Sequence, residues 1–241
     1  MERIAGTGGE TETEIIGGIG LPESLEGFEG PFPYDPKHLK RLAGPLLAEA
    51  AAIARPKAAF RLALIEAEDL GCGHRVGIGP VVLENNVLAD NLKDLGRAFP
   101  FVATEGPELA EWASGLGPRD KNVAFLFRYM ALKEAERRLE LRLTELYGLS
   151  GLGAMSPGVL PAWPLTGQKE LFELLSPLPG RLGVSLNAQS FWMSPGVSSS
   201  GIYFETEAGF HNCRLCPLDA CPLRRFVRDP AGAPAAPGLS G

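Results

Sequence analysis

Apolar residues recur at helical spacing along two long segments of the chain. The first segment covers residues 35–54, where Asp35-Pro36 is a typical helix start. The second covers residues 119–147, and Gly148 is placed to cap it. Its apolar stripe predicts a buried face made of Val123, Leu126, Met130, Ala131, Ala135, Leu139, Leu143 and Leu146. Its charges predict a solvated outer face with i,i+4 pairs, made of Glu134, Arg137, Arg138 and Arg142.

Shorter patterns predict strands and small helices around these two helices. Apolar or alternating runs predict strands at residues 60–65, 81–83, 99–104, 184–193 and 199–204. Further helices are predicted at residues 86–95, 107–116 and 167–175, the last capped by Thr166. Residues 151–164 are rich in glycine and proline and predict a loop. Because strands and helices are mixed without regular β-α-β alternation, the pattern favours an α+β fold.

These elements divide the chain into four parts. Residues 1–30 are rich in glycine and glutamate, which predicts a mostly flexible segment with one edge strand. Residues 31–210 form the predicted α+β domain, and residues 211–230 carry most of the cysteines. Residues 231–241, AGAPAAPGLSG, predict a disordered tail.

Composition narrows the class of protein. The chain has 241 residues, 45% of them hydrophobic, and a formal net charge of −6. That charge argues against a general nucleic-acid-binding protein, which normally carries a basic surface. The sequence contains no apolar run long enough for a membrane span and no secretory signal pattern at its start. We therefore expect a cytoplasmic protein without a membrane partner, in a compartment that keeps thiols reduced.

Cys213, Cys216 and Cys221 follow one another within nine residues, in the pattern C-x-x-C-x-x-x-x-C-P. Reduced cysteines at this spacing predict a metal or iron–sulfur site, because the short turns between them let each thiolate reach one centre. Zinc and cuboidal iron–sulfur clusters both usually take four ligands. The candidates for the fourth are Cys72, His211, His74 or an exogenous ligand. The absence of a fourth local cysteine favours an iron–sulfur cluster over zinc.

Each part of this prediction has an alternative. The triplet can be three free thiols or a redox pair. Cys72, between two glycines, can be a small packing residue. Four arginines surround the triplet, and this basic rim is either a solvated tail or a docking surface for an acidic redox protein: Arg214, Arg224, Arg225 and Arg228.

Residues 156–204 carry a series of motifs in a specific order. Pro157-Gly158 is followed by Pro164, the Leu174-Leu175 pair and a Gly-x-x-Leu run at residues 183–186. The segment then ends on residues Ser190, Phe191, Met193, Pro195, Ser198, Ser200, Gly201, Tyr203 and Phe204. This order and spacing resembles the activation domain of cobalamin-dependent methionine synthase. The ending from Cys221 to Arg225 is similar to stand-alone versions of that domain, which also end in a cysteine cluster.

The resemblance implies both a fold and a task. The fold would be α+β, with a mixed or antiparallel sheet flanked by helices and a C-terminal cysteine-cluster loop. The task would be to return inert cob(II)alamin, carried by a methionine synthase or another corrinoid protein, to methylcobalamin, as a component of a methyltransferase system. S-adenosylmethionine would donate the methyl group, and a small electron-transfer protein would supply the electron. By the same resemblance, six residues would face the ligand or the corrin: Pro157, Gly158, Ser198, Ser200, Gly201 and Tyr203.

Two departures from the family pattern concern S-adenosylmethionine. The family has an arginine three residues before the proline of Pro-Gly and a tyrosine after the glycine, where this chain has Ala154 and Val159. An arginine that grips a carboxylate cannot be replaced by alanine without the loss of a charge-assisted pair. Either another arginine, such as Arg181, takes its place, or the chain uses the cysteine cluster without binding the ligand in the family's way. The alternative function is a docking module for a corrinoid protein that is stabilised by zinc and has no redox chemistry.

Trp163 and Trp192 are predicted as core aromatics.

Overall fold

The computed structural model describes residues 2–4, 12–21, 36–69, 74–84, 86–160 and 163–207. Within this part of the chain, nine strands form one antiparallel sheet. They are β1 Glu2–Ile4, β2 Thr13–Ile16, β3 Lys57–Arg61, β4 Ala63–Asp69, β5 His74–Ile78, β6 Val81–Glu84, β7 Arg97–Thr104, β8 Leu152–Met155 and β11 Ser198–Glu205. A separate hairpin joins β9 Ser185–Leu186 to β10 Met193–Ser194.

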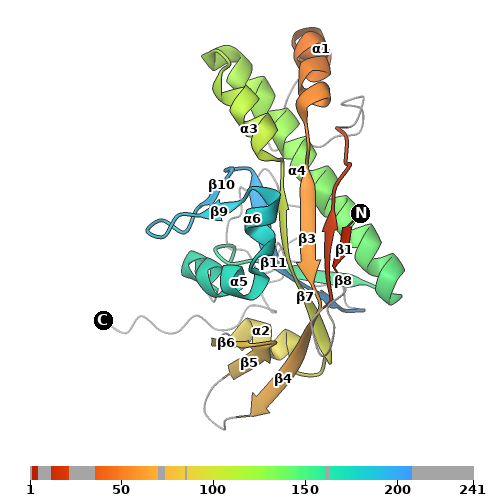
Figure 1. Ribbon diagram of the computed structural model, residues 1–241, viewed down its shortest axis with the longest axis vertical. Coiled ribbons are helices and arrows are strands. Elements are labelled where there is room, and N and C mark those ends of the chain that lie inside the picture. Colours follow the sequence, from red (N-terminus) through yellow and green to blue (C-terminus); the bar gives the residue numbers. More distant parts are fainter. Residues whose placement is uncertain are drawn as a thin grey trace.

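Strand β7 is the axis of the sheet. One of its edges pairs with β3 and, further along, with β4, and its other edge pairs with β11. β11 in turn pairs with β8, so β11 is an interior strand. The meander β4–β5–β6 extends the sheet at one end of the molecule, as Figure 1 shows.

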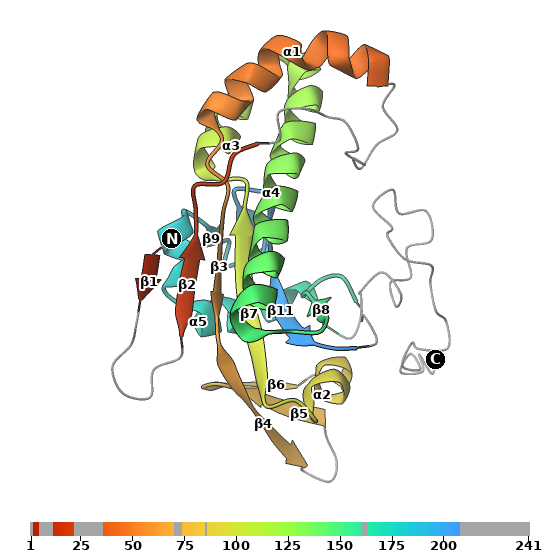
Figure 2. The ribbon, with the colours of Figure 1, turned by 90° about the vertical axis from the view of Figure 1, so that its right-hand side faces the viewer.

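Helices cover both faces of the sheet. They are α1 Pro36–Ile53, α2 Asn86–Leu92, α3 Pro107–Ser114, α4 Pro118–Tyr147, η1 Leu165–Gly167, α5 Gln168–Leu175 and α6 Leu178–Leu182. The long α4 runs along one face, whereas α5 and α6 pack on the other (Figures 1 and 2). α1 and α3 gather around the first half of α4 at the end of the molecule opposite β4–β6.

The alternation of side chains along β7 explains this layering. Ala98 and Val102 point into the apolar cluster under α5 and α6. Phe99, Phe101 and Ala103 point into the cluster under α4. Because both faces are covered, the strand is apolar at nearly every position, as a strand buried on two sides must be.

The sequence pattern of α4 is largely confirmed. Seven of the eight stripe residues are buried, and Leu146 is partly buried. Gly148 adopts the left-handed conformation, with φ 62°, and caps the helix. The expectation for Arg142 is wrong, because its guanidinium does not lie on the solvated face. It donates to both carboxylate oxygens of the buried Glu14 on β2, at 2.8 and 3.2 Å.

Several shorter predictions differ from the structure. The run 60–65 is divided between β3 and β4, which pair with different parts of β7. Residues 152–155, predicted as loop, form β8, because the edge of β11 offers them hydrogen-bonding partners. Residues 2–4 and 12–21, the described part of the first thirty residues, contain two strands rather than one, and Ile16 is buried. Helix α5 begins without a side-chain cap, so Thr166 does not cap it.

The predicted strand 184–193 is a hairpin instead. The carboxamide oxygen of Asn187 accepts hydrogen bonds from the backbone N–H groups of Gln189 and Ser190, at 2.9 and 2.8 Å, which turns the chain. Phe191 then adopts a left-handed φ of 57°. This turn leaves Trp192 66% exposed, so the prediction of a core position is wrong for Trp192, whereas Trp163 is buried. None of the helices in the described ranges combines the length and the apolar character that a membrane span needs.

Candidate functional site

The pairing of β8 with β11 brings the two main sequence motifs together. Met155 lies opposite Ile202 and Ala154 opposite Tyr203, so the Pro157-Gly158 loop leaves β8 beside the start of β11. The contact is closest at Gly201. A Cβ atom there would lie 2.3 Å from the Met155 carbonyl oxygen and 2.6 Å from the Ser156 hydroxyl. Only glycine permits this approach of the two backbones.

The Pro157-Gly158 loop has a fixed geometry. Gly158 has φ 82°, a left-handed conformation that favours glycine, and its N–H donates to the Trp163 carbonyl at 2.7 Å. Pro157 is buried, whereas Gly158 and the following Val159 are exposed. The exposed part of this motif is therefore its backbone together with the side chain of Val159.

The serines of β11 are held by partners on both faces of the sheet. The buried Ser200 hydroxyl donates to the carboxamide oxygen of Gln168 on α5 at 2.7 Å. On the other face, the Ser199 hydroxyl donates to the Glu136 carboxylate on α4 at 2.7 Å. The Ser198 hydroxyl lies 2.9 Å from the Thr104 hydroxyl and donates to the Pro195 carbonyl at 2.8 Å. Ser198 and Ser199 are half-buried, so this end of the strand is accessible, unlike its buried middle.

Tyr203 is part of the core under α4. Its side chain is only 4% exposed, and its ring lies 4.2 Å, centroid to centroid, from that of Phe101. Its hydroxyl donates to the Glu140 carboxylate at 2.9 Å. A ligand at this strand would therefore meet the exposed Gly158 loop and the Ser198 end of β11 before it met Tyr203.

A buried ion pair that the sequence did not indicate lies at the same end of β11. The Glu105 side chain is fully buried, and its carboxylate accepts two hydrogen bonds from the Arg128 guanidinium on α4, at 2.5 and 2.6 Å. It also accepts the Val197 N–H at 3.3 Å, while the Glu105 N–H donates to the Val197 carbonyl at 3.2 Å. Burial raises the pKa of Glu105, and the hydrogen bonds from Arg128 and Val197 oppose that shift. Glu105 thus links α4, through Arg128, to Val197, the residue that precedes Ser198.

The sequence gives little indication that Glu105 and Arg128 form a buried ion pair. Glu105 directly follows a buried apolar strand and precedes Gly106-Pro107, a place where a charged residue usually reaches solvent. Its partner stands 23 residues later in a helix whose charged residues suggest a solvated face.

The two positions that depart from the family pattern lie at different exposures. Ala154 packs against the apolar cluster under α4, and Val159 is 39% exposed. Arg181, the arginine considered as a substitute, belongs to α6, whose Leu178 and Leu182 pack on the opposite face of the sheet. Arg181 therefore does not lie on the α4 face, where Ala154 points.

The predicted metal ligands Cys72, Cys213, Cys216 and Cys221 lie outside the described residues, as does His211. The side chain of His74, at the start of β5, also lies outside them. Within the described ranges, no three or more histidine, cysteine, aspartate or glutamate residues are grouped so that they could hold a metal ion. The cysteine site thus remains a prediction from the sequence.

The described residues define an α+β domain built on an antiparallel sheet with helices on both faces. This is the fold of a known reactivation domain. The chain is similar to the crystal structure of the MetH reactivation domain bound to AdoHcy, with a TM-score of 0.57 and 20% sequence identity, over 70% of this chain and 65% of that one. The predicted fold class is therefore confirmed. The chain thus matches less than two thirds of the length of that neighbour. No family model and no curated protein matches the sequence.

Proposed function

We propose that the chain reactivates the cobalamin of a methionine synthase, or of another corrinoid protein, by a reductive methylation. The observation that carries the proposal is the β8–β11 register, which sets the Pro157-Gly158 loop beside the serine-rich start of β11. The shared fold with a reactivation domain that binds AdoHcy supports it. The proposed site residues are Pro157, Gly158, Ser198, Ser200, Gly201 and Tyr203. Gly158 and Ser198 would contact the ligand or the corrin, and the buried Pro157, Ser200, Gly201 and Tyr203 would hold them in position.

The proposed reaction joins one electron and one methyl transfer. Cob(II)alamin on the partner takes up an electron to give cob(I)alamin. Cob(I)alamin then attacks the methyl carbon of S-adenosylmethionine, so that a cobalt–carbon bond forms and a carbon–sulfur bond breaks. The products are methylcob(III)alamin and S-adenosylhomocysteine, and the methyl transfer makes the unfavourable reduction irreversible. The corrin carries the chemistry, and the protein supplies position and electrostatics.

The cysteine triplet is proposed as the electron relay. Cys213, Cys216 and Cys221 would hold an iron–sulfur cluster, with Cys72 as the fourth ligand. A small electron-transfer protein would reduce this cluster. The arginines that surround the triplet in the sequence would favour a negatively charged thiolate cluster and an acidic partner.

The first experiment is purification of the protein without oxygen, followed by metal and sulfide analysis. We expect brown protein that contains iron and sulfide. Cys213→Ser should lose the colour, and Cys72→Ser tests the fourth ligand separately. A colourless protein that carries one zinc would contradict the relay and would favour the alternative of a zinc-stapled docking module without redox chemistry.

The second experiment measures reactivation. The reduced protein is mixed with a methionine synthase in the cob(II)alamin state, with and without S-adenosylmethionine, and the corrin absorbance is followed. We expect methylcobalamin only when S-adenosylmethionine is present. If cob(II)alamin is reduced equally well without it, the chain delivers electrons and a different protein delivers the methyl group. Calorimetric titration of the chain alone with S-adenosylmethionine separates these two cases, because Ala154 removes the family's arginine.

A further inference from the structure

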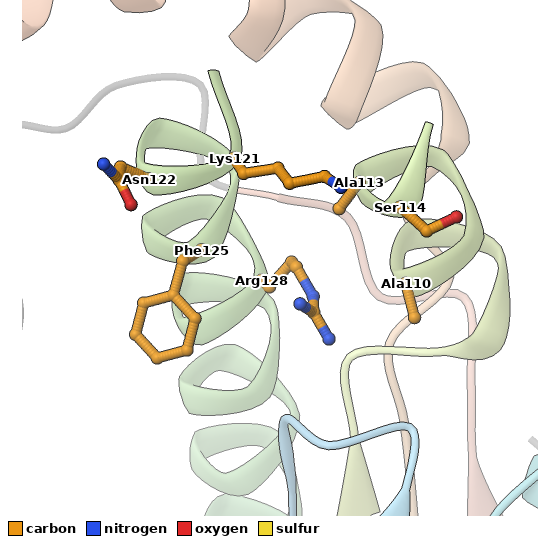
Figure 3. A pocket seen from close by; sticks show the side chains of 7 residues that line it. All are labelled: Ala110, Ala113, Ser114, Lys121, Asn122, Phe125 and Arg128. Atoms are coloured by element: carbon orange, nitrogen blue, oxygen red, sulfur yellow. The ribbon is translucent and has the colours of Figure 1, made fainter. Parts of the chain in front are cut away.

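A cavity of about 850 Å³ lies between α3 and the first half of α4. Figure 3 shows the side chains that line it. They are Ala110, Ala113 and Ser114 on α3, and Lys121, Asn122, Phe125 and Arg128 on α4. The volume falls within the range of about 300–1,000 Å³ that is typical of pockets for small organic ligands.

Among the described residues that line the cavity, both charged side chains are cations. In Figure 3, Arg128 extends into the space between the two helices, and Lys121 reaches across it towards Ala113. The Arg128 guanidinium is held in place, because two of its nitrogens donate to the buried Glu105 carboxylate. Its outer edge is thereby presented in a fixed orientation, and this reduces the entropy that a bound anion would have to offset.

The Arg128–Glu105 pair is neutral as a unit, so the net positive charge of the described lining residues comes from Lys121. Among the described residues, the Lys121 side chain forms no ion pair or hydrogen bond. A single negative charge on a ligand matches this arrangement, since it would interact with the ammonium group and with the outer N–H groups of the guanidinium.

The rest of the lining is mostly apolar. Ala110 and Ala113 on α3 present small apolar side chains, and the Phe125 ring, 36% exposed, lies on the side of α4 away from α3 (Figure 3). Ser114 and Asn122 add one hydroxyl and one carboxamide. An apolar wall with a few polar groups is the usual composition of a site for an organic molecule rather than for a bare inorganic ion.

We propose that this cavity binds a small organic carboxylate whose body is aromatic or aliphatic. The carboxylate would lie between Lys121 and the outer edge of Arg128, and the body would pack on Ala110 and Ala113 of α3. The site is separate from the proposed corrinoid function and does not depend on it.

The test uses the full chain and 2-naphthoate as the probe, with the neutral 2-naphthamide as its isostere and acetate as the bare anion. Equilibrium dialysis should show that naphthoate binds about tenfold more tightly than naphthamide, because only the acid forms charge-assisted bonds. Acetate should bind more weakly than naphthoate because it lacks the apolar body. Equal affinity for the acid and the amide, or a dissociation constant for naphthoate above about 1 mM, would overturn the proposal.

Variants locate the site. Lys121→Gln should weaken naphthoate binding about fivefold, the effect of one exposed charge, while Lys169→Gln on α5 should leave it unchanged. Ala110→Leu narrows the cavity on its α3 side and should weaken naphthoate binding about fivefold or more, and a thermal unfolding curve close to that of the parent would show that the variant still folds. Arg128 is left intact, because its removal would strand Glu105. An Ala110→Leu variant that folds and binds naphthoate normally would place the ligand elsewhere.

Discussion

The two faces of the sheet are stabilised in different ways. Under α5 and α6 the contact is an apolar cluster, crossed by a buried hydrogen bond from the Ser200 hydroxyl to Gln168. Under α4 the apolar cluster is accompanied by two buried carboxylates, Glu14 and Glu105, and each pairs with an arginine of the helix. The ion pairs lie near the two ends of the part of α4 that covers the sheet.

The ion pairs determine which position α4 adopts on the sheet more than they determine the stability of the fold. An apolar interface allows a helix to shift or rotate slightly, because neighbouring packings have similar free energies. Two directional ion pairs at Arg128 and Arg142 permit one position of α4 only. We infer that the ion pairs fix α4, and with it the partners of Ser199 and Tyr203, even where they add little net stability.

The largest expected effect comes from Glu105→Gln. It leaves the Arg128 guanidinium half-buried without a carboxylate and should lower the free energy of unfolding by about 3–5 kcal/mol, measured by urea denaturation. The double variant Glu105→Leu/Arg128→Met is the control and should be far closer to the parent, because no charge is left unpaired. If the single and double variants lose the same stability, the pair does not act as a unit.

The apolar face should respond to cavity formation. Leu171→Ala on α5 removes a fully buried side chain and should cost about 3 kcal/mol, whereas Leu64→Ala, at a position 62% exposed, should cost less than about 0.5 kcal/mol. Both values come from denaturation curves. Removal of the Arg128 charge should restore most of the stability that Glu105→Gln loses. No substitution of a charged residue should restore the stability that Leu171→Ala loses. A cost for Leu171→Ala as small as that for Leu64→Ala would contradict the tight packing of this face.

The buried contact between Ser200 and Gln168 on the apolar face should give an intermediate effect. Ser200→Ala leaves the Gln168 oxygen buried without its donor and should cost about 1.5 kcal/mol in a denaturation experiment. Ser199→Ala on the other face is the matched control. Because Glu136 also pairs with Lys133, this variant should cost less than about 1 kcal/mol. A larger effect for Ser199→Ala would mean that the accessible serine, not the buried one, holds β11.

The smallest effect is expected on the outside of α4. Glu134 pairs there with Arg137 and Arg138, and Glu134→Gln should cost less than about 1 kcal/mol, with the difference reduced by salt. The hydrogen bond from Arg137 lowers the pKa of Glu134. The ionised Glu134 carboxylate therefore contributes to the free energy of unfolding above the pKa of the unfolded state. This contribution is lost as the pH falls through the lower pKa of the folded state. In denaturation experiments over a series of pH values, the difference between the two proteins should be full at pH 7 and should shrink as the pH falls below the pKa of the unfolded state, and a difference that stays constant in acid would need another cause.

The long, periodic elements could be predicted from the sequence. The stripe of α4 and the apolar run of β7 depend on local spacing, and the structure confirms both. The strand β8 could not be predicted, because residues 152–155 have no strand pattern of their own and are strands only through pairing with β11. Trp192 was misplaced for a similar reason, since the turn at Asn187 depends on side-chain hydrogen bonds rather than on hydrophobic periodicity.

The candidate site shows the same limit. The Pro157-Gly158 and Ser198–Gly201 motifs were visible in the sequence, but their adjacency follows from strand register, which the sequence does not reveal. The burial of Ser200 and Tyr203 could not be read from it either. The ion pair of Glu14 joins residues 128 positions apart, a separation that no local pattern can indicate.

The interior position of β11 has a consequence for how the protein is made. β11 is the last element of the described chain to be synthesised, yet it fills the gap between β7 and β8. Until it emerges, β7 and β8 each present an open edge, and the apolar residues that α4 and α5 cover are incompletely shielded. Pairing of such distant segments is intrinsically slow, so the nascent chain passes through a stage that is prone to aggregation. The candidate site on β8 and β11 is therefore completed only at the end of folding.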